Sequence, residues 1–317
     1  MFRDGDPVTP EFRGAVVAIG NLDGLHRGHQ ALIATAIASA RRAGRPAAIL
    51  TFDPHPRVFF APDAPYFRLM SERTKLKVLA RMEVDAAFIR RFDTALAGTS
   101  AADFVGRLLG QELGAAGVVV GADFHFGRGR EGTPAVLADL ARRNGIAVDA
   151  VGTVLVEGSP VSSSRIRGAL EAGDVPLANE LLGFRWFVDG EVRHGDKRGR
   201  TLGFPTANVA LGEDCRLAHG IYAVRAATPS GTVHDGVASF GRRPTFDNGA
   251  PLLETYLFDF SGDLYGAPVE VEFVERLRPE QRFESADALI AQMRSDEQEA
   301  RRVLAKAMPV GMRSYIG

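Results

Sequence analysis

Two histidines, His26 and His29, stand three residues apart in the glycine-rich stretch 20–30, with Arg27 between them. An apolar run precedes this stretch and a helical pattern follows it, so the pair falls where a helix should begin. The first N–H groups of a helix lack partners within the helix, and the positive end of its dipole favours anions. Imidazole N–H groups and a guanidinium would add directed donors. We therefore predict a nucleotide-phosphate site over this stretch.

The surrounding sequence predicts the elements that hold this motif in place. Residues 15–19 form one apolar, strand-like run and residues 47–52 form a second. Between them, apolar residues recur at helical spacing until Gly44 and Pro46 end the pattern. A strand–helix–strand unit of this length implies parallel strands joined by a right-handed crossover. Open α/β sheets bind ligands beyond the carboxyl ends of their strands, which is where the two histidines fall.

The same alternation continues to about residue 150 and predicts a doubly wound α/β domain. Three helix-start signals support it, namely Ser71, the capping box of Ser100 and Asp103, and Thr133 followed by Pro134. They predict helices over residues 72–82, from 100 to about 113, and from 133 to 145. Further strands are predicted over residues 85–89, 117–120 and 146–151.

Other polar segments follow or open several of these elements. Residues 51–56 and 121–132 come at the ends of predicted strands, and residues 162–167 read Ser-Ser-Ser-Arg-Ile-Arg at a helix start. Hydroxyls, helix-start amides and arginines are suited to binding an anion. Arg165 and Arg167 point in different directions on a helix, so we leave open which of them reaches the ligand. Four polar loops at one edge of one sheet favour a functional site over four unrelated turns.

The composition indicates an ordinary globular protein of 317 residues, long enough for two domains. Its net charge of −1 argues against a protein whose main task is to bind nucleic acid through phosphates. The single cysteine, Cys215, excludes an intrachain disulfide, as expected in a reducing cytosol. No apolar run approaches the length of a membrane span, and residues 1–10 lack the apolar core of a signal peptide. We expect a cytoplasmic protein without nucleic-acid or membrane partners.

The pattern changes after residue 183. An apolar helical run over residues 175–182 ends at Gly183, and residues 185–193 alternate between apolar and polar. Short strands are then predicted at 221–226, 237–240, 254–260 and 269–274, which suggests an antiparallel barrel or sandwich. Ser285 should cap a long final helix with the apolar stripe Leu289, Ile290, Met293, Val303 and Leu304. We place the boundary near 183–186, giving domains over residues 1–183 and 184–317.

A basic, glycine-punctuated loop in the second half leads into Phe-Pro-Thr-Ala-Asn at residues 204–208. Thr206 and Asn208 are two residues apart, so in an extended segment their side chains project from the same face. A hydroxyl and an amide oxygen placed in this way suit Mg²⁺, which prefers oxygen ligands and also binds phosphates.

The N-terminal motifs resemble those of the nucleotidyltransferase superfamily, which transfers AMP or CMP from a nucleoside triphosphate and releases pyrophosphate. Residues 26–29 match its HxGH motif, and residues 161–167 resemble its ISSTxIR motif, with Val161 and Ser164 in place of Ile and Thr. Residues 20–29 together with 51–56 are similar to the adenylyltransferase module of bacterial bifunctional FAD synthetase. Leu22 stands where that family usually has Phe.

The resemblance implies a role for each motif. His26 and His29 would hold the triphosphate, and Arg165 or Arg167 the leaving pyrophosphate. A flavin phosphate nucleophile is already ionised, so the reaction needs positioning and charge neutralisation and does not need a general base. The implied nucleotide and phosphate contacts are Gly20, Asn21, Asp23, Gly24, Gly28, Ser162, Ser163 and Ser164. The implied flavin contacts are Asp53, Pro54, His55, Asp123, Phe124 and Phe126.

The second half resembles the riboflavin kinase family in residues 195–208, 220–222, 241–246 and 254–266. The resemblance implies that Thr206 and Asn208 bind Mg²⁺–ATP. Glu254 would be the general base, because the ribityl 5′-hydroxyl must lose its proton. Asp259 and Asp263 are rival bases, although their segment resembles a turn. Further implied contacts are Gly199, Gly203 and Pro205 to nucleotide and Arg243 to flavin.

Together these resemblances imply an α/β parallel-sheet nucleotidyltransferase domain followed by a small antiparallel β-barrel riboflavin kinase domain with a terminal helix. Such a protein would phosphorylate riboflavin to FMN and adenylate FMN to FAD, using ATP and Mg²⁺, with the flavins as substrates and products. We expect a monomer or weak homo-oligomer. The alternatives are a catalytically inactive flavin- or nucleotide-binding regulator, one active and one vestigial domain, and an adenylyltransferase for another phosphate acceptor.

Overall fold

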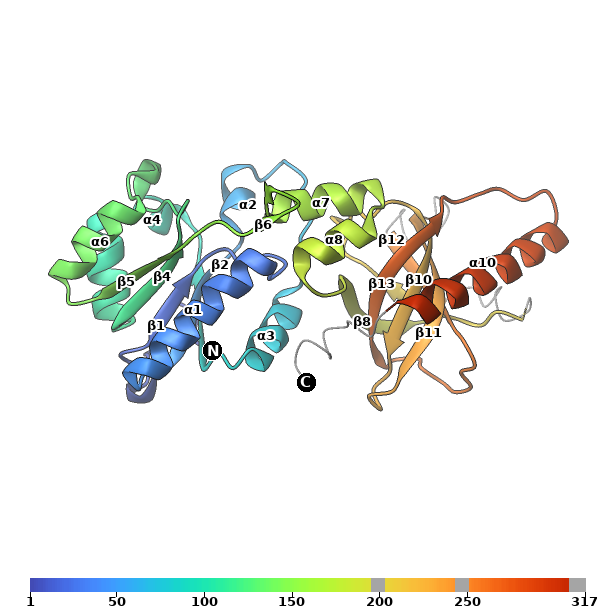
Figure 1. The fold of residues 1–317 in the computed structure, drawn as a ribbon, viewed down its shortest axis with the longest axis horizontal. Coiled ribbons are helices and arrows are strands. Elements are labelled where there is room, and N and C mark those ends of the chain that lie inside the picture. The colour runs from blue at the N-terminus through green and yellow to red at the C-terminus, as the bar shows by residue number, and fades with distance from the viewer. Residues whose placement is uncertain (195–202, 243–250, 308–317) are drawn as a thin grey trace. The chain divides into compact units, whose positions relative to one another are not determined.

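The computed structural model describes residues 1–194, 203–242 and 251–307 (Figure 1). Its backbone contacts form two compact units. The first unit contains Met1–Tyr66 and Met70–Ser162, and the second contains Phe67–Leu69 and Ser163–Gly317. This division of the contacts falls between Ser162 and Ser163, and the functional domain boundary after residue 183 stays a prediction. Within the described ranges, no helix has the length and apolar character needed to cross a bilayer.

The first unit is built on a parallel sheet with the strand order β3-β2-β1-β4-β5 (Figure 1). Its strands are β1 (Val16–Ile19), β2 (Ala47–Asp53), β3 (Ala86–Arg91), β4 (Gly117–Gly121) and β5 (Ala147–Val151). All four residues of the central strand β1 are buried, as expected for a strand covered on both faces. The predicted doubly wound α/β domain is confirmed.

Helices connect these strands, and three of them begin at the predicted caps. They are α1 (Arg27–Ala43), α2 (Pro56–Phe60), α3 (Glu72–Arg81), α4 (Thr94–Ala97), α5 (Ala101–Asp103) and α6 (Pro134–Arg143), with short 3₁₀ turns at Pro10–Phe12 and Arg128–Arg130. The side chains of Ser71, Ser100 and Thr133 each accept a backbone N–H from the first turn of their helix. A small hairpin of β6 (Leu155–Val156) and β7 (Ser159–Pro160) follows β5.

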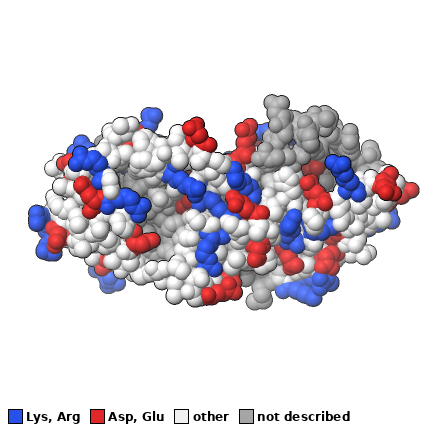
Figure 2. All heavy atoms as spheres, turned by 90° about the horizontal axis from the view of Figure 1, so that it is seen from above, with Lys and Arg blue, Asp and Glu red and all other residues white. Residues whose placement is uncertain are grey.

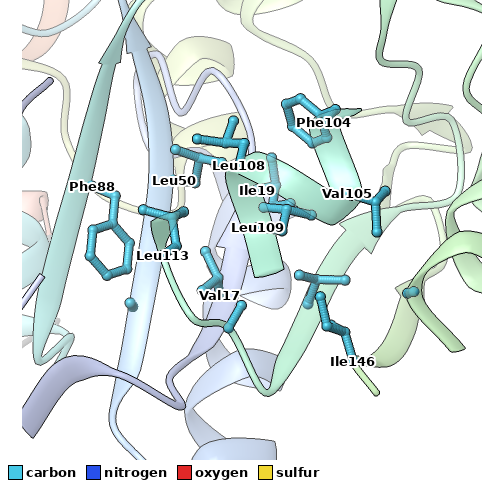
Figure 3. Close-up of a cluster of buried hydrophobic side chains, with 14 of the residues drawn as sticks. Val17, Ile19, Leu50, Phe88, Phe104, Val105, Leu108, Leu109, Leu113 and Ile146 are labelled. Carbon is cyan, nitrogen blue, oxygen red and sulfur yellow. The ribbon is translucent and has the colours of Figure 1, made fainter. Parts of the chain in front are cut away.

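The helix expected to run from residue 100 to about 113 differs from its prediction. After α5 the chain continues as a π-helix over Phe104–Glu112, labelled η2, so that Leu113 N–H donates to the carbonyl of Leu108. Gly106 and Gly110 lie within this segment and lower its preference for the tighter α-helical turn. Its apolar side chains still pack on the sheet and form the core with Val17, Ile19, Leu50, Phe88 and Ile146 (Figure 3).

The second unit is a closed antiparallel barrel with the strand order β10-β11-β12-β9-β8-β13, in which β13 pairs with β10. Its strands are β8 (Phe187–Arg193), β9 (Thr206–Ala210), β10 (Gly220–Ala227), β11 (Val233–Arg242), β12 (Pro251–Leu257) and β13 (Pro268–Arg278). Helices α7 (Ser163–Ala172) and α8 (Val175–Leu182) precede the barrel, and α10 (Ala286–Lys306) ends it. The barrel and the terminal helix, capped by Ser285, are confirmed.

The long helix α10 lies on the barrel through a stripe that is not wholly apolar. Ala300, Val303 and Leu304 are buried, but so is Asp296, at a position of the same stripe. The carboxylate of Asp296 accepts two hydrogen bonds from Arg278 of β13, at 2.8 and 2.7 Å. A buried, bidentate ion pair of this kind fixes the position of the helix, because removing either partner would leave the other charge buried and unpaired.

Charged side chains of both signs are distributed over the surface shown in Figure 2. Lys and Arg are interspersed with Asp and Glu, and neither sign dominates the view, in keeping with the net charge of −1.

Candidate active sites

The histidine motif lies where the order of strands in the first sheet reverses. The chain moves outward from β1 to β2 and β3, and then returns to place β4 on the other side of β1. The segments after β1 and after β4 therefore leave neighbouring strands at the same edge of the sheet. Ligands of open α/β sheets bind at such a reversal.

The loop between β1 and the histidines has a tightly fixed backbone. The N–H of Gly20 donates to the carbonyl of Leu50 at 3.1 Å. Leu22, Gly24 and Leu25 then adopt φ values of 52°, 86° and 48°, in the left-handed region that leucine rarely occupies. Both leucine side chains are completely buried, so the core holds the backbone in this conformation. Two of the three implied glycine contacts of this motif, Gly20 and Gly24, are thus part of a rigid turn before the helix.

His26 is the N-cap residue of α1. Its Nδ1 accepts the backbone N–H of His29 at 3.3 Å, which satisfies one of the otherwise unpaired donors of the first turn. Because Nδ1 is the acceptor, the proton of the neutral ring is on Nε2. The cap therefore fixes His26 as a hydrogen-bond donor through the opposite edge of its ring.

The packing of the two histidine rings explains why the motif has a glycine at position 28. The rings of His26 and His29 stack with centroids 3.7 Å apart and planes 15° from parallel. A Cβ atom on Gly28 would lie 3.2 Å from Nδ1 and Cε1 of His26, closer than side chains normally approach. A glycine between the histidines leaves space for the His26 ring to fold back over the start of the helix.

We expect Gly28→Ala to separate stability from activity. Alanine has the higher helix propensity, by about 1 kcal/mol in a helix interior, so the free energy of unfolding should not fall greatly. The added methyl group should displace the His26 ring and lower the rate of any reaction that uses both imidazoles. Thermal unfolding and turnover at this site measure the two effects. Gly152→Ala, which adds a Cβ atom in open space, is the matched control. Unchanged turnover in Gly28→Ala would contradict the steric role.

Both histidines are neutral near pH 7. Burial lowers the pKa of His26 to about 4, against a smaller opposing effect of Asp23. Burial also lowers the pKa of His29 well below its usual value, and the nearby His26, Lys75 and His55 lower it further. The Nδ1 atom of His29 is buried without a hydrogen-bond partner in the described part of the chain. The pair can therefore donate hydrogen bonds to an anion without acting as histidinium or as a base that titrates near neutrality.

These pKa values predict the pH dependence of the site. Turnover there should be independent of pH between about 7 and 8.5, because neither imidazole titrates in that range. A rate that depended on histidinium with an ordinary pKa would fall about tenfold per pH unit above about 6.5. A pH profile of kcat/KM distinguishes the two cases.

The free energy of unfolding should instead depend on pH in the acidic range. The folded pKa of His26, about 4, lies below its unfolded value of about 6.5, so the unfolded chain binds more protons between these values. The free energy of unfolding should fall as the pH drops through this window. His26→Asn retains an N-cap oxygen without a titrating ring and should reduce the slope. An unchanged slope would contradict the burial of a neutral His26.

A second group of polar and aromatic side chains contacts the loop through Asp23. Asp23 is 3% exposed, and its Oδ2 accepts a hydrogen bond from the Tyr66 hydroxyl at 2.9 Å. The ring of His55 stacks on Tyr66 with centroids 4.7 Å apart. His55 also caps α2 by accepting the N–H of Arg57 at Nδ1, immediately after the half-buried Asp53 and Pro54. Asp23 and His55 are thus brought together by Tyr66, a residue that the motifs did not indicate.

The carbonyl of Asn21 is the other fixed point of the loop. It accepts hydrogen bonds from Thr51 Oγ1 at 3.0 Å and from Lys75 Nζ at 3.2 Å. The residue itself is exposed. Lys75 had no motif to mark it, since it lies on α3, far along the chain.

The predicted flavin contacts after β4 differ in exposure. Asp123 is exposed and Phe124 is half-buried, whereas Phe126 is buried and packs on Phe104. Phe124 and Phe126 stack with centroids 5.5 Å apart, so Phe126 supports Phe124 from the core side.

Sequence reasoning missed a second aromatic group at the end of β2. Phe59, Phe60 and Phe92 meet edge to face, with ring centroids 5.2 to 5.6 Å apart, and Phe52 lies beside Phe92. Phe60 is 68% exposed, which is unusual for so large an apolar side chain. The adjacent phenylalanines 59 and 60, directly after the 51–56 segment, were the available signal.

The serine-rich motif lies across the division between the units. Ser162 ends the first unit, and Ser163, Ser164, Arg165 and Arg167 open α7 in the second. Both arginines are half-buried. Arg167 Nε donates to the carbonyl of Phe67 at 2.6 Å, within the second unit. The choice between Arg165 and Arg167 as the phosphate contact therefore stays open.

The second candidate site is a row of residues on adjacent strands of the barrel. Asn208 of β9 lies directly opposite Glu254 of β12, and Thr206 lies opposite Tyr256. Directly paired residues of antiparallel strands project from the same face. The neighbouring positions on the other face, including Val209 and Leu253, are buried in the barrel interior. Thr206, Asn208 and Glu254 consequently share the outer face of the barrel.

Asn208 has the features expected of a cation ligand. It is 6% exposed, and its Oδ1 is buried without a hydrogen-bond partner among the described residues. A buried amide oxygen without a donor is costly unless another group satisfies it. No cluster of three His, Cys, Asp or Glu that could bind a metal occurs in the described ranges. The amide oxygen of Asn208 and the hydroxyl of Thr206 are oxygen donors of the kind that Mg²⁺ prefers.

The three carboxylates proposed as bases have different surroundings. Glu254 is half-buried beside Asn208. Asp259 is exposed, and two hydrogen bonds from Arg301 lower its pKa, which makes it a weaker base. Asp263 accepts the backbone N–H of Tyr265 at 3.0 Å and forms a local turn. The geometry therefore favours Glu254.

Two of the remaining predicted contacts, Gly203 and Pro205, lie just before β9. Gly203 is exposed with a φ of 86°, and Pro205, two residues later, is also exposed. Between them Phe204 is buried and packs edge to face on Tyr256. Gly199 and Arg243 lie outside the described residues.

Comparisons with known proteins relate both sites to flavin biosynthesis. The FAD synthetase family matches residues 8–165, and the riboflavin kinase family matches residues 182–304. Three curated relatives are described as bifunctional riboflavin kinase/FMN adenylyltransferase. The Pseudomonas fluorescens protein is 41% identical over 94% of this chain and 96% of its own length. Those of Haemophilus influenzae and Escherichia coli K12 are each 38% identical, over 91% and 93% of this chain and 94% and 95% of their own lengths.

A solved structure has the same fold over most of the chain. It is a crystal structure of a protein described as a macrolide-efflux protein from Streptococcus pneumoniae, with a TM-score of 0.84 and 32% identity. The match covers 93% of this chain and 96% of that one.

Proposed function

The chain belongs to the family of bifunctional riboflavin kinase/FMN adenylyltransferases, and we propose that its two candidate sites divide the two reactions between them. The barrel site phosphorylates riboflavin to FMN with ATP. The histidine site transfers the adenylyl group of ATP to FMN, giving FAD and pyrophosphate. The observation that carries the proposal is that each family match contains one complete motif, with the stacked histidines inside residues 8–165 and the Thr206–Asn208–Glu254 row inside residues 182–304.

In the adenylyl transfer, the phosphate of FMN attacks the α-phosphorus of ATP. This nucleophile is already an anion, so the site needs donors placed around the phosphates and no general base. His26 supplies Nε2–H, as its N-cap bond requires, and His29 stacks beside it. The helix-start amides of α1 add fixed partial positive charge. Arg165 or Arg167 from the serine-rich motif would hold the departing pyrophosphate.

The flavin acceptor requires an apolar surface for its ring system. The cluster of Phe59, Phe60 and Phe92 provides one after β2, and Phe124 provides another after β4. Exposed aromatic rings stack readily on a planar ligand. Asp53, Pro54 and His55 lie between β2 and the phenylalanines, and Asp123 precedes Phe124. These residues are the proposed flavin contacts, with Phe126 in support from the core.

In the kinase reaction, the ribityl 5′-hydroxyl attacks the γ-phosphorus of ATP and loses a proton. Glu254 is the proposed base that accepts it. Thr206 and Asn208 would hold Mg²⁺, whose chemistry is to neutralise phosphate charge and orient the transferring group. Asn208 Oδ1 suits this role, because it is a buried oxygen without a partner in the described fold. The register between β9 and β12 places the base beside the proposed ligand.

Incubation of the purified protein with riboflavin, ATP and Mg²⁺, followed by chromatographic separation of the flavins, tests the whole proposal. FMN and then FAD should accumulate, and omission of Mg²⁺ should stop both. Accumulation of FMN alone, or no turnover, would reject the bifunctional assignment. We further propose that the enzyme acts in the cytoplasm as a monomer or weak homo-oligomer, in keeping with its single cysteine.

A further inference from the structure

The adenylyltransferase site presents an imbalance of charge. ATP and FMN bring several negative charges, and transfer places more on the leaving pyrophosphate. The two motif histidines are neutral, since burial lowers both of their pKa values. Cations must therefore supply the compensating charge, and beside Mg²⁺ and the proposed arginine of the serine-rich motif a lysine can contribute, as at other phosphate-binding sites.

Lys75 of α3 lies in this part of the site. Its Nζ donates to the carbonyl of Asn21 at 3.2 Å, and Asn21 is the second residue of the loop that leads into the histidines. Its positive charge is also close enough to His29 to contribute to the lowered pKa of that ring. Two separate relations, one to the loop and one to the imidazole, thus place the ammonium group beside the motif.

The start of α3 holds this lysine in a fixed position. Ser71 caps the helix through Thr74 N–H, and the carbonyl of Ser71 accepts the N–H of Lys75 at 2.9 Å. Thr74 and Val78 are buried on either side, so the first turn is anchored in the core. Thr51 of β2 donates to the same Asn21 carbonyl, which ties the lysine, the sheet and the loop together.

We propose that Lys75 contacts a phosphate of the substrates of adenylyl transfer and is the cation that works beside the stacked histidines. This inference rests on the assignment of adenylyl transfer to the first site. An ammonium group carries three donors, so it can hold the Asn21 carbonyl and bind a phosphate oxygen at the same time. Lys75 therefore both positions the loop and neutralises phosphate charge.

The test measures both directions of the reaction in Lys75→Met. FAD formation from supplied FMN and ATP runs forward, and formation of FMN and ATP from FAD and pyrophosphate runs in reverse. We expect kcat/KM to fall by about 10- to 100-fold in each direction, the size expected for a lost hydrogen bond between charged groups. The KM for FMN or that for inorganic pyrophosphate should rise about tenfold, which identifies the phosphate that Lys75 contacts. Lys75→Arg should recover part of the loss, because it keeps the charge.

Controls separate a phosphate contact from a structural effect. Lys77→Met changes the same residue type on the same helix and should stay within about twofold of the wild type. The thermal midpoint of Lys75→Gln, which keeps a hydrogen-bond donor without charge, should match that of the wild type while its KM values resemble those of Lys75→Met. Wild-type KM values for both ligands in Lys75→Met, or equal losses in Lys75→Arg and Lys75→Met, would overturn the proposal. Absence of FAD synthesis by the wild type would instead reject the assignment of the site.

Discussion

Glu254→Gln should reduce riboflavin phosphorylation by about 10²- to 10⁴-fold, the usual contribution of a positioned general base. Glutamine has nearly the same shape as glutamate, so the pairing of β12 with β9 beside Asn208 should persist. Its amide cannot accept the proton that the ribityl hydroxyl must lose. FMN production from riboflavin, followed by chromatography, measures the loss. FAD production from supplied FMN should remain unchanged, because that reaction needs no base.

The matched control is Glu275→Gln, an exposed strand carboxylate of the same barrel. It should retain both activities. A Glu254→Gln protein that phosphorylates riboflavin at the wild-type rate would remove the residue from the mechanism. Asp259 would then be the next candidate, although its ion pair with Arg301 lowers its pKa and weakens it as a base.

His29→Ala should have the complementary effect. Loss of one fixed donor at a site of developing charge costs about 10²- to 10³-fold in turnover, and this variant also removes the ring that stacks on His26. FAD formation from FMN should fall accordingly, whereas FMN formation from riboflavin should continue. The flavin product ratio from a single incubation with riboflavin therefore reports the defect directly, because FMN accumulates without FAD.

His234→Ala is a suitable control, because His234 is a half-buried histidine of the barrel that packs on Phe260. It should leave adenylyl transfer unaffected. If His29→Ala remained folded, as judged by its thermal midpoint, and lost both activities equally, the assignment of one reaction to each site would be wrong. Retention of FAD synthesis would instead show that His29 is only a structural part of the helix start.

The architecture of the first unit could be predicted because its signals are local. The strands of the sheet were predicted from short apolar runs, and three helices begin at recognisable caps, among them Ser71 and Thr133. The histidine motif was also predictable, since its position depends only on a strand ending and a helix beginning. The stacking of the rings and the left-handed conformations of Leu22 and Leu25 were not, because they depend on tertiary packing.

The residues that sequence reasoning missed are those brought in from distant elements. Lys75 and Tyr66 reach the loop across the fold, and no spacing in the sequence relates them to His26. Asp296 breaks an otherwise apolar stripe of helix α10, and its partner Arg278 lies on strand β13. The π-helical segment was not predicted, because only tertiary packing decides between helices of such similar geometry.

The closure of the barrel limits how the kinase site can change during turnover. A strand in an open sheet can shift at its free edge, but every strand of this ring is hydrogen-bonded on both sides. Sliding β9 against β12 by one residue would turn Asn208 toward the interior while Glu254 stayed outside, and it would break pairings around the ring. We therefore expect Asn208 and Glu254, the proposed metal ligand and base, to keep one spacing during turnover. Insertions between the strands should therefore be tolerated far better than insertions within β9 or β12.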